Sequence, residues 1–113
     1  MPYVGFETSI ELSQTQKETV KKMIGEIISL IPGKTVETTM FNIKGGAFLE
    51  KGETADECAF VDVRLRGTAP NEAKDAFVKA FCAKLKSEFG LEPSHVYMNF
   101  SEFEVWGSNG GLH

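Results

Sequence analysis

The same order of predicted strands and helices occurs twice along this chain, and this internal repeat restricts the fold more than any other feature of the sequence. In each half, a strand-like segment is followed by a helical pattern and then by a second strand-like segment. The strand-like segments are residues 2–9, 36–43, 59–66 and 96–103, and apolar and polar residues alternate most clearly in the third. The sequence therefore predicts a single domain made of two β-α-β halves, about residues 1–50 and 51–113.

Both helical patterns have recognisable ends. In the first, apolar residues recur at the i, i+3, i+4, i+7 spacing of one helical face. Ser13 and Gln16 fit a capping box before this pattern, and a Pro-Gly pair follows it, which predicts a helix over about residues 14–30. The second pattern, rich in Ala and Phe, begins near residues 68–70 and ends at Gly90, the usual residue type just past a helix.

The repeated order determines how the sheet is covered. A helix that links two strands of one sheet makes them parallel and packs on one face. Two such units predict an α/β (α+β) fold with a four-stranded sheet and both helices on the same side. The uncovered face would carry a mixed set of side chains: Asp62, Arg64, Arg66, Tyr97 and Asn99. A closed oligomer would cover this face. The apolar residues 47–49 are expected to form an edge strand that docks on a neighbouring subunit.

Composition excludes several functional classes. The net charge is −4 and no Lys/Arg cluster is present, which argues against nucleic-acid or anionic-membrane partners. Cys58 and Cys82 lack CxxC spacing, and His95 and His113 are far from any ligand cluster, so we expect neither a disulfide nor a metal nor another cofactor. No leader-like segment or bilayer-length apolar run is present, so the cytoplasm is the expected location.

Pro2 is the residue with the most chemical potential, because it directly follows Met1 at the head of the first strand. Removal of Met1 would convert its ring nitrogen from an amide into a secondary amine. Free α-amino groups have pKa values of about 7.7–8, and an apolar pocket or a nearby cation lowers them by disfavouring the charged form. Such an amine suits general acid-base catalysis near neutral pH. Taken alone, however, a Met-Pro pair more often simply begins an edge strand.

The order of several short motifs resembles the macrophage migration inhibitory factor and D-dopachrome tautomerase family of the tautomerase superfamily. The motifs are Met1-Pro2, Pro32-Gly33-Lys34, Glu57-Cys58-Ala59 and Val96-Tyr97-Met98-Asn99. The resemblance runs from end to end, whereas the shorter 4-oxalocrotonate tautomerases contain one β-α-β unit. It implies a homotrimer with a pocket at each subunit interface. It also implies cofactor-independent keto-enol tautomerisation of phenylpyruvate-like α-keto acids.

The same resemblance assigns roles to five residues. Pro2 would be the catalytic general acid and base, and Lys34 would bind the substrate. Tyr97 and Asn99 would line the pocket from a neighbouring subunit, and Trp106 would add an apolar wall. Structural alternatives exist for three of them: a cation at a helix end for Lys34, sheet packing for Tyr97 and core filling for Trp106.

Two departures from the family pattern leave the substrate open. Thr38 stands where the migration inhibitory factor has a tyrosine, and Arg66 replaces an isoleucine, so Arg66 is counted among the substrate-binding residues. Arg64 and Arg66 share a strand face and are able to clamp a carboxylate, as in the decarboxylase and dehalogenase branches of the superfamily, with Glu37 as a stand-in for their acidic residue. For Arg64, an ion pair with Asp62 is the favoured alternative.

A third interpretation belongs to a different class of protein. A cytokine-like protein would bind a receptor, keep only a vestigial pocket and need non-classical secretion. The interpretations differ at Pro2, because a catalyst requires Met1 to be removed and loses activity on Pro2→Ala, whereas a binding protein tolerates both.

Overall fold

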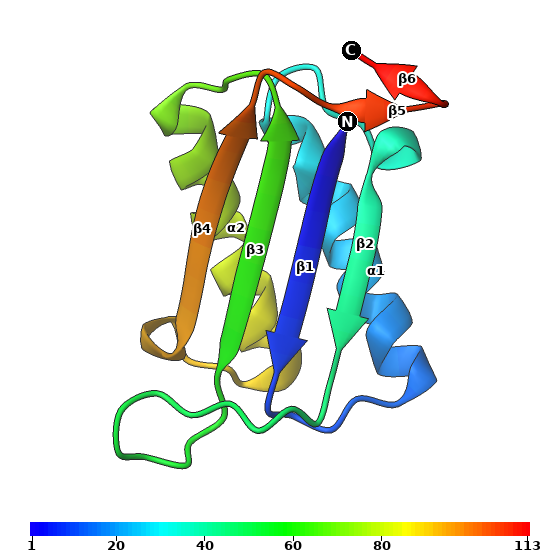
Figure 1. Ribbon diagram of the computed structural model, residues 1–113. Helices are drawn as coiled ribbons and strands as arrows, with labels where there is room; N and C mark the ends of the chain where they lie inside the picture. The colour runs from blue at the N-terminus through cyan, green and yellow to red at the C-terminus, as the bar shows by residue number, and fades with distance from the viewer.

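The computed structural model describes residues 1–113 and contains a mixed four-stranded sheet with two helices on one face (Figure 1). Its strands are β1 (Pro2–Thr8), β2 (Met40–Lys44), β3 (Ala59–Arg66) and β4 (Val96–Phe103), and its helices are α1 (Gln14–Ile27) and α2 (Asn71–Phe89). The strand order is β2-β1-β3-β4. Strands β1 and β2 are parallel, as are β3 and β4, while β1 and β3 are antiparallel. The predicted fold class is confirmed.

Local sequence explains the start of α1 and the end of α2. Ser13 Oγ accepts a hydrogen bond from the Gln16 backbone at 3.1 Å, and Gln16 Oε1 accepts one from the Ser13 backbone at 2.8 Å, so the expected capping box is present. Helix α1 ends at Ile27, and Ile28–Leu30 continues as a 3₁₀ turn. Helix α2 ends at Phe89 and is followed by the C-cap Gly90, whose φ of 68° is the left-handed conformation that glycine adopts easily. No helix of this chain is long and apolar enough to span a bilayer.

The hydrophobic core lies between the helices and one face of the sheet. Phe81 of α2 is fully buried and stacks on Phe6 of β1, with 5.8 Å between ring centroids. Burying a side chain of this size stabilises the fold by about 1.5–3 kcal/mol. Every second residue of β3 joins this core, from Ala59 to Leu65. The intervening residues of β3 therefore point to the other face.

That other face of the sheet is covered by no helix (Figure 1). It carries the half-buried Phe60 and Asp62, the exposed Arg64, and Tyr97, which is 58% exposed. The uncovered mixed face expected from the alternation is thus present.

The second strand differs from the prediction at its start. Strand β2 begins at Met40, and Val36–Thr38 instead forms a 3₁₀ turn. Local hydrogen bonds explain the difference, because the Thr39 hydroxyl donates to the Thr35 carbonyl at 2.7 Å and the Thr39 backbone N–H donates to the Val36 carbonyl at 3.2 Å. Threonine side chains that bond nearby backbone in this way compete with an extended strand.

Residues 47–49, which were predicted to form an edge strand on a neighbouring subunit, form no strand within the single chain, and that docking stays a prediction. A single backbone hydrogen bond, from Ala47 to the Thr8 carbonyl at 3.0 Å, ties this segment to β1. Phe48 is 92% exposed, whereas Leu49 is partly buried and its carbonyl accepts a hydrogen bond from Cys58 Sγ at 3.1 Å.

A C-terminal hairpin that the sequence did not predict completes the fold. Strands β5 (Gly107–Ser108) and β6 (Gly111–Leu112) are too short to give an alternating pattern, and the turn between them has positive φ at Asn109 and Gly110. The hairpin lies beside the start of β1 (Figure 1). Its closing bond runs from the His113 backbone to the Trp106 carbonyl at 2.8 Å. This arrangement brings the C-terminal segment to the N-terminus.

Candidate active site at the start of the first strand

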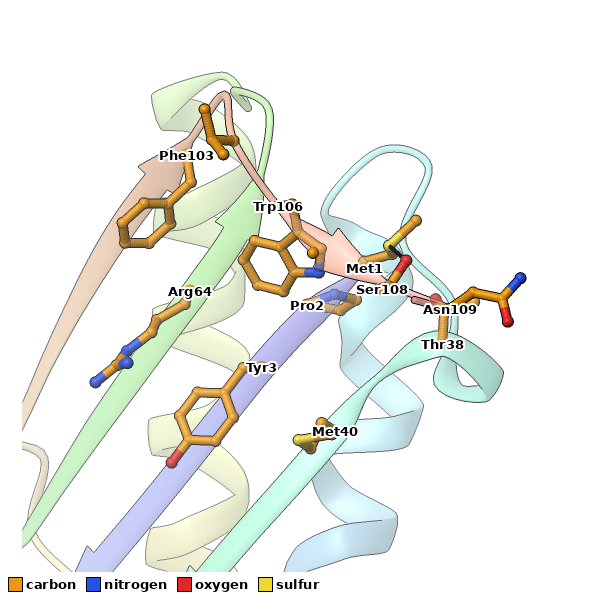
Figure 2. Close-up of a pocket in the computed structure, with 12 residues that line it drawn as sticks. Met1, Pro2, Tyr3, Thr38, Met40, Arg64, Phe103, Trp106, Ser108 and Asn109 are labelled. Carbon is orange, nitrogen blue, oxygen red and sulfur yellow. Dashed lines mark hydrogen bonds between the residues drawn. The ribbon is translucent and has the colours of Figure 1, made fainter. Parts of the chain in front are cut away.

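A cavity of about 690 Å³ opens where β1 begins (Figure 2). Its walls come from parts of the chain that are far apart in sequence. The lining residues are Met1 to Tyr3, Thr38 at the end of the 3₁₀ turn, Met40 at the start of β2, Arg64 of β3, and residues in the segment 103–109. The cavity therefore exists only because the sheet order and the C-terminal hairpin bring these segments together.

Pro2 lies buried in the wall of this cavity. It is the first residue of β1 and faces Leu65 of β3 in the antiparallel register. A proline is tolerated at this place because the first residue of a strand need not donate to the ladder. Trp106 lines the same cavity, and Figure 2 shows its indole near the Pro2 ring. Pairing with β3 thus fixes Pro2 at the cavity wall.

The free amine at this end of the chain is in an environment that favours loss of its proton. With Met1 in place, the pKa of the Met1 amine is lowered from its ordinary value by burial, then by the charge of Lys34 and a hydrogen bond with it, and then by Arg66. Lys34 Nζ also donates to the Arg66 carbonyl at 2.8 Å. This hydrogen bond to the end of β3 thus holds the Lys34 ammonium beside the N-terminus.

The structure brings some of the residues expected in the site together. Pro2 and Trp106 line the cavity, and Lys34 lies beside the terminal amine. The Arg66 side chain is exposed and does not line the cavity, although its charge acts on the terminal amine and its carbonyl holds Lys34. Thr38, the position that departs from the family pattern, is also in the wall.

Tyr97 and Asn99 lie elsewhere on the sheet of the same chain. Tyr97 pairs with Phe60, whereas Pro2 pairs with Leu65, so five residues of β3, roughly 16 Å of strand, separate the two levels. Tyr97 lines a smaller cavity of about 240 Å³, and Lys51 Nζ lies 5.0 Å from the centroid of its ring. Neither Tyr97 nor Asn99 lines the Pro2 cavity of the same chain.

Several cavity residues were not counted as site residues from the sequence, among them Tyr3, Met40 and Phe103, and Arg64 was considered only in the decarboxylase or dehalogenase alternative. Alternation places Tyr3 and Arg64 on the open face, but only the β1–β3 register puts them side by side. The expected ion pair of Arg64 with Asp62 is present, with 2.9 Å between Nη2 and Oδ2, yet the same side chain lines the cavity. No group of His, Cys, Asp or Glu side chains is placed to hold a metal ion.

Comparison with known proteins gives one consistent result. The family model described as macrophage migration inhibitory factor matches residues 1–111. Among solved structures, that of MIF2 from Leishmania major is similar to this chain with a TM-score of 0.90 and 18% identity, and the match covers 100% of this chain and 97% of that one. No curated protein matches the sequence significantly.

Two further structures are similar over nearly their whole lengths. The macrophage migration inhibitory factor-like protein of Entamoeba histolytica gives a TM-score of 0.81 at 19% identity, with 99% of this chain and 98% of that chain covered. Pt0534, in a structure of the protein inactivated by 2-oxo-3-pentynoate, gives a TM-score of 0.81 at 19% identity, with 97% of this chain and 94% of that chain covered. At these identities the structural likeness establishes the fold, and the family model covers nearly the whole sequence.

Proposed function

This chain belongs to the macrophage migration inhibitory factor family, and on that basis we propose that it is a keto-enol tautomerase acting on phenylpyruvate-like α-keto acids. The observation that carries this proposal is the position of Pro2. Pro2 is the first residue of β1 and lies in the wall of the cavity. Beside it, burial and the charges of Lys34 and Arg66 lower the pKa of the terminal amine and so favour its neutral form. Removal of Met1 would leave the Pro2 nitrogen as the terminal amine in that environment.

The reaction follows from the chemistry of a secondary amine. The neutral Pro2 nitrogen removes a proton from the substrate carbon between the keto group and the aromatic ring, and the electron pair moves to the carbonyl oxygen. The Pro2 ammonium then gives this proton to the oxygen, directly or through solvent, which forms the enol and restores the neutral amine. In the opposite direction, the hydroxyl proton of the enol passes to the Pro2 nitrogen, and the resulting ammonium delivers a proton to carbon. Because the amine is regenerated, no cofactor is consumed.

Lys34 supplies the charge that this chemistry needs. Its ammonium has three donors, and the Arg66 carbonyl accepts from one of them, at 2.8 Å. The other donors are available to a substrate carboxylate or to the oxygen that becomes negative in the transition state. Trp106 and Phe103, whose ring centroids are 6.2 Å apart, offer an aromatic wall for the substrate ring.

We also propose a homotrimer in which Tyr97 and Asn99 of a neighbouring subunit complete each cavity. Two observations support it. Both residues are exposed on the uncovered sheet face, and neither lines the Pro2 cavity of its own chain.

The alternative function, a decarboxylase or dehalogenase that uses Arg64 and Arg66, receives less support. Only Arg64 lines the cavity, while the Arg66 side chain and Glu37 lie outside its walls. A bidentate clamp by both guanidiniums is therefore not assembled. No feature of the fold favours a receptor-binding role over catalysis.

The test is the rate of phenylpyruvate tautomerisation by protein whose intact mass shows that Met1 is absent. We expect Pro2→Ala to lower kcat/KM by about 10²- to 10⁴-fold, the usual contribution of a general base. Pro93→Ala, at an exposed position remote from the cavity, is the matched control and should retain activity. Equal activity of Pro2→Ala and the parent protein would refute the proposal.

A covalent probe provides an independent test. Pt0534 is inactivated by 2-oxo-3-pentynoate. This compound has an alkyne conjugated to its keto group, so an unprotonated amine adds to the alkyne and a proton enters at the adjacent carbon. We expect it to react with Pro2 in this protein.

A further inference from the structure

A second cation lines the Pro2 cavity, on the open face of the sheet. Arg64 of β3 faces Tyr3 of β1 in the antiparallel register, and its guanidinium carbon lies 5.3 Å from the centroid of the Tyr3 ring. Both side chains contribute to the cavity wall (Figure 2). A planar guanidinium near an aromatic ring gains cation–π attraction and keeps its N–H groups available at its edge.

The Tyr3 ring is fixed in place by residues of two strands. A Cβ atom at Gly5 would lie 2.9 Å from Tyr3 Oη and 3.2 Å from a ring carbon, so only the absence of a side chain at Gly5 lets the ring lie over β1. Asn42 of β2 donates from Nδ2 to Tyr3 Oη at 2.9 Å. The ring therefore forms a defined surface beside Arg64.

Arg64 retains unused hydrogen-bonding capacity. Its Nε and Nη2 donate to the same oxygen of Asp62, Oδ2, at 3.2 and 2.9 Å. A guanidinium has five N–H donors, and the others have no protein acceptor here. The Arg64 side chain is 54% exposed, and exposed ion pairs hold their partners weakly. A ligand carboxylate is thus able to share Arg64 with Asp62 or to replace it.

We propose that Arg64 and the Tyr3 ring form a distal anion-binding subsite of the Pro2 cavity. The preferred α-keto acid then carries a second carboxylate at the end remote from its keto-acid group. This inference rests on the proposed function, in which Lys34 binds the keto-acid end beside Pro2. The guanidinium fork matches the two oxygens of a carboxylate, and Arg64 lines the cavity from β3, whereas Lys34 lies beside the terminal amine and donates to the Arg66 carbonyl.

The experiment compares phenylpyruvate with 4-carboxyphenylpyruvate, which differs only by a carboxylate on the ring. The measured quantity is the ratio of kcat/KM for the carboxylated substrate to that for phenylpyruvate. We expect a ratio well above unity, and Arg64→Met should lower it by about tenfold or more, because a charge-assisted hydrogen bond is lost. Asp62→Asn should raise the ratio, since it removes the competing anion.

Lys79→Met is the matched control. It removes one positive charge from the outer surface of α2, where Lys79 pairs with Asp75 at 2.9 Å, and it should leave the ratio unchanged. A ratio that is the same in the parent protein and in Arg64→Met would overturn the subsite while turnover of phenylpyruvate still upheld the tautomerase.

Binding separates the two proposals if neither substrate is turned over. Calorimetric titration then compares cinnamate with 4-carboxycinnamate as unreactive probes. Tighter binding of 4-carboxycinnamate that is lost in Arg64→Met would support the subsite even though the proposed function had failed. Equal binding of the two probes by the parent protein would overturn the subsite.

Discussion

Pro2 owes its proposed role to the groups around it. A proline at the start of a strand is chemically inert as long as its nitrogen is part of an amide. In this chain the strand begins in a cavity wall, with Lys34 and Arg66 close enough to lower the pKa of a terminal amine. The combination of a strand start, a cavity and two cations distinguishes Pro2 from the other prolines of the sequence.

The charge of Lys34 gives a pH-dependent prediction. Only the neutral Pro2 amine accepts a proton, so kcat/KM should rise with pH through the pKa of this amine and then level off. Burial and the Lys34 cation lower the pKa of an amine at this terminus, which places the rise below the ordinary α-amino value of about 8. Lys34→Met should therefore move the rise to higher pH, as measured by pH–rate profiles of phenylpyruvate tautomerisation.

Lys86→Met is the control for that shift, because Lys86 pairs with Glu92 far from the cavity. Its profile should coincide with that of the parent protein. A Lys34→Met profile that also coincided with the parent profile would mean that Lys34 does not act on the catalytic amine.

The limits of sequence reasoning are clearest for Tyr3 and Arg64. Pro2, Lys34 and Trp106 were identified through short motifs, and the structure places all three at or beside one cavity. Tyr3 and Arg64 belong to the same cavity because residue 3 faces residue 64 across β1 and β3. No local pattern specifies which residue of one strand faces which residue of another, so their proximity depended on the register.

At the level of elements, the strongest periodic signals gave the most accurate predictions. Strand β3, with its strict alternation, and β4 have the predicted bounds, and α2 is followed by the predicted glycine. The errors fall where local hydrogen bonding overrides the pattern, as in the threonine-rich turn Val36–Thr38, or where an element is only two residues long, as in the β5–β6 hairpin.

The entry into α2 depends on a residue of β4. Pro70, the residue before the helix, offers no side-chain cap, and Glu102 instead accepts hydrogen bonds from the Ala69 backbone at 2.6 Å and from Lys74 Nζ at 3.0 Å. The bonds from Lys74 and then Ala69 lower the pKa of Glu102. A carboxylate near a helix N-terminus also interacts favourably with the helix dipole.

Glu102→Gln should therefore reduce the free energy of unfolding at neutral pH. The contribution of Glu102 is present above the unfolded glutamate pKa of about 4.3 and is lost as the pH falls through the lower folded value. Urea unfolding should show the parent protein to be more stable at neutral pH, with the difference disappearing in acid. Glu104→Gln, at an exposed position two residues along, is the control. A constant difference at all pH values would show that the carboxylate charge is not involved.

For the whole molecule, the central feature is a sheet with one bare face. All large buried side chains lie on the helical side, while Tyr97, Asn99 and Arg64 face outward. The family fold and this bare face together motivate the proposed trimer. In this trimer, β4 of a neighbouring subunit would supply Tyr97 and Asn99 to each Pro2 cavity.

Mixing two defective variants tests this shared site. If Pro2 and Tyr97 of one site come from different subunits, Pro2→Ala and Tyr97→Ala proteins should each be impaired. Unfolding and refolding them together in equal amounts should restore activity, because roughly a quarter of the interfaces combine two intact halves. Each variant refolded alone is the control. Activity that stays at the average of the two variants, or a monomer in light scattering, would contradict the shared site.

The most direct measurement concerns the terminal amine itself: treat the protein with 2-oxo-3-pentynoate and locate the adduct by intact mass and peptide mapping. We expect protein that lacks Met1 to gain one equivalent of reagent on the Pro2 nitrogen, with phenylpyruvate slowing the reaction and tautomerase activity falling in step. A protein that lacks Met1 but leaves Pro2 unmodified, or that reacts only at a lysine or cysteine, would contradict the assignment of Pro2 as the reactive base.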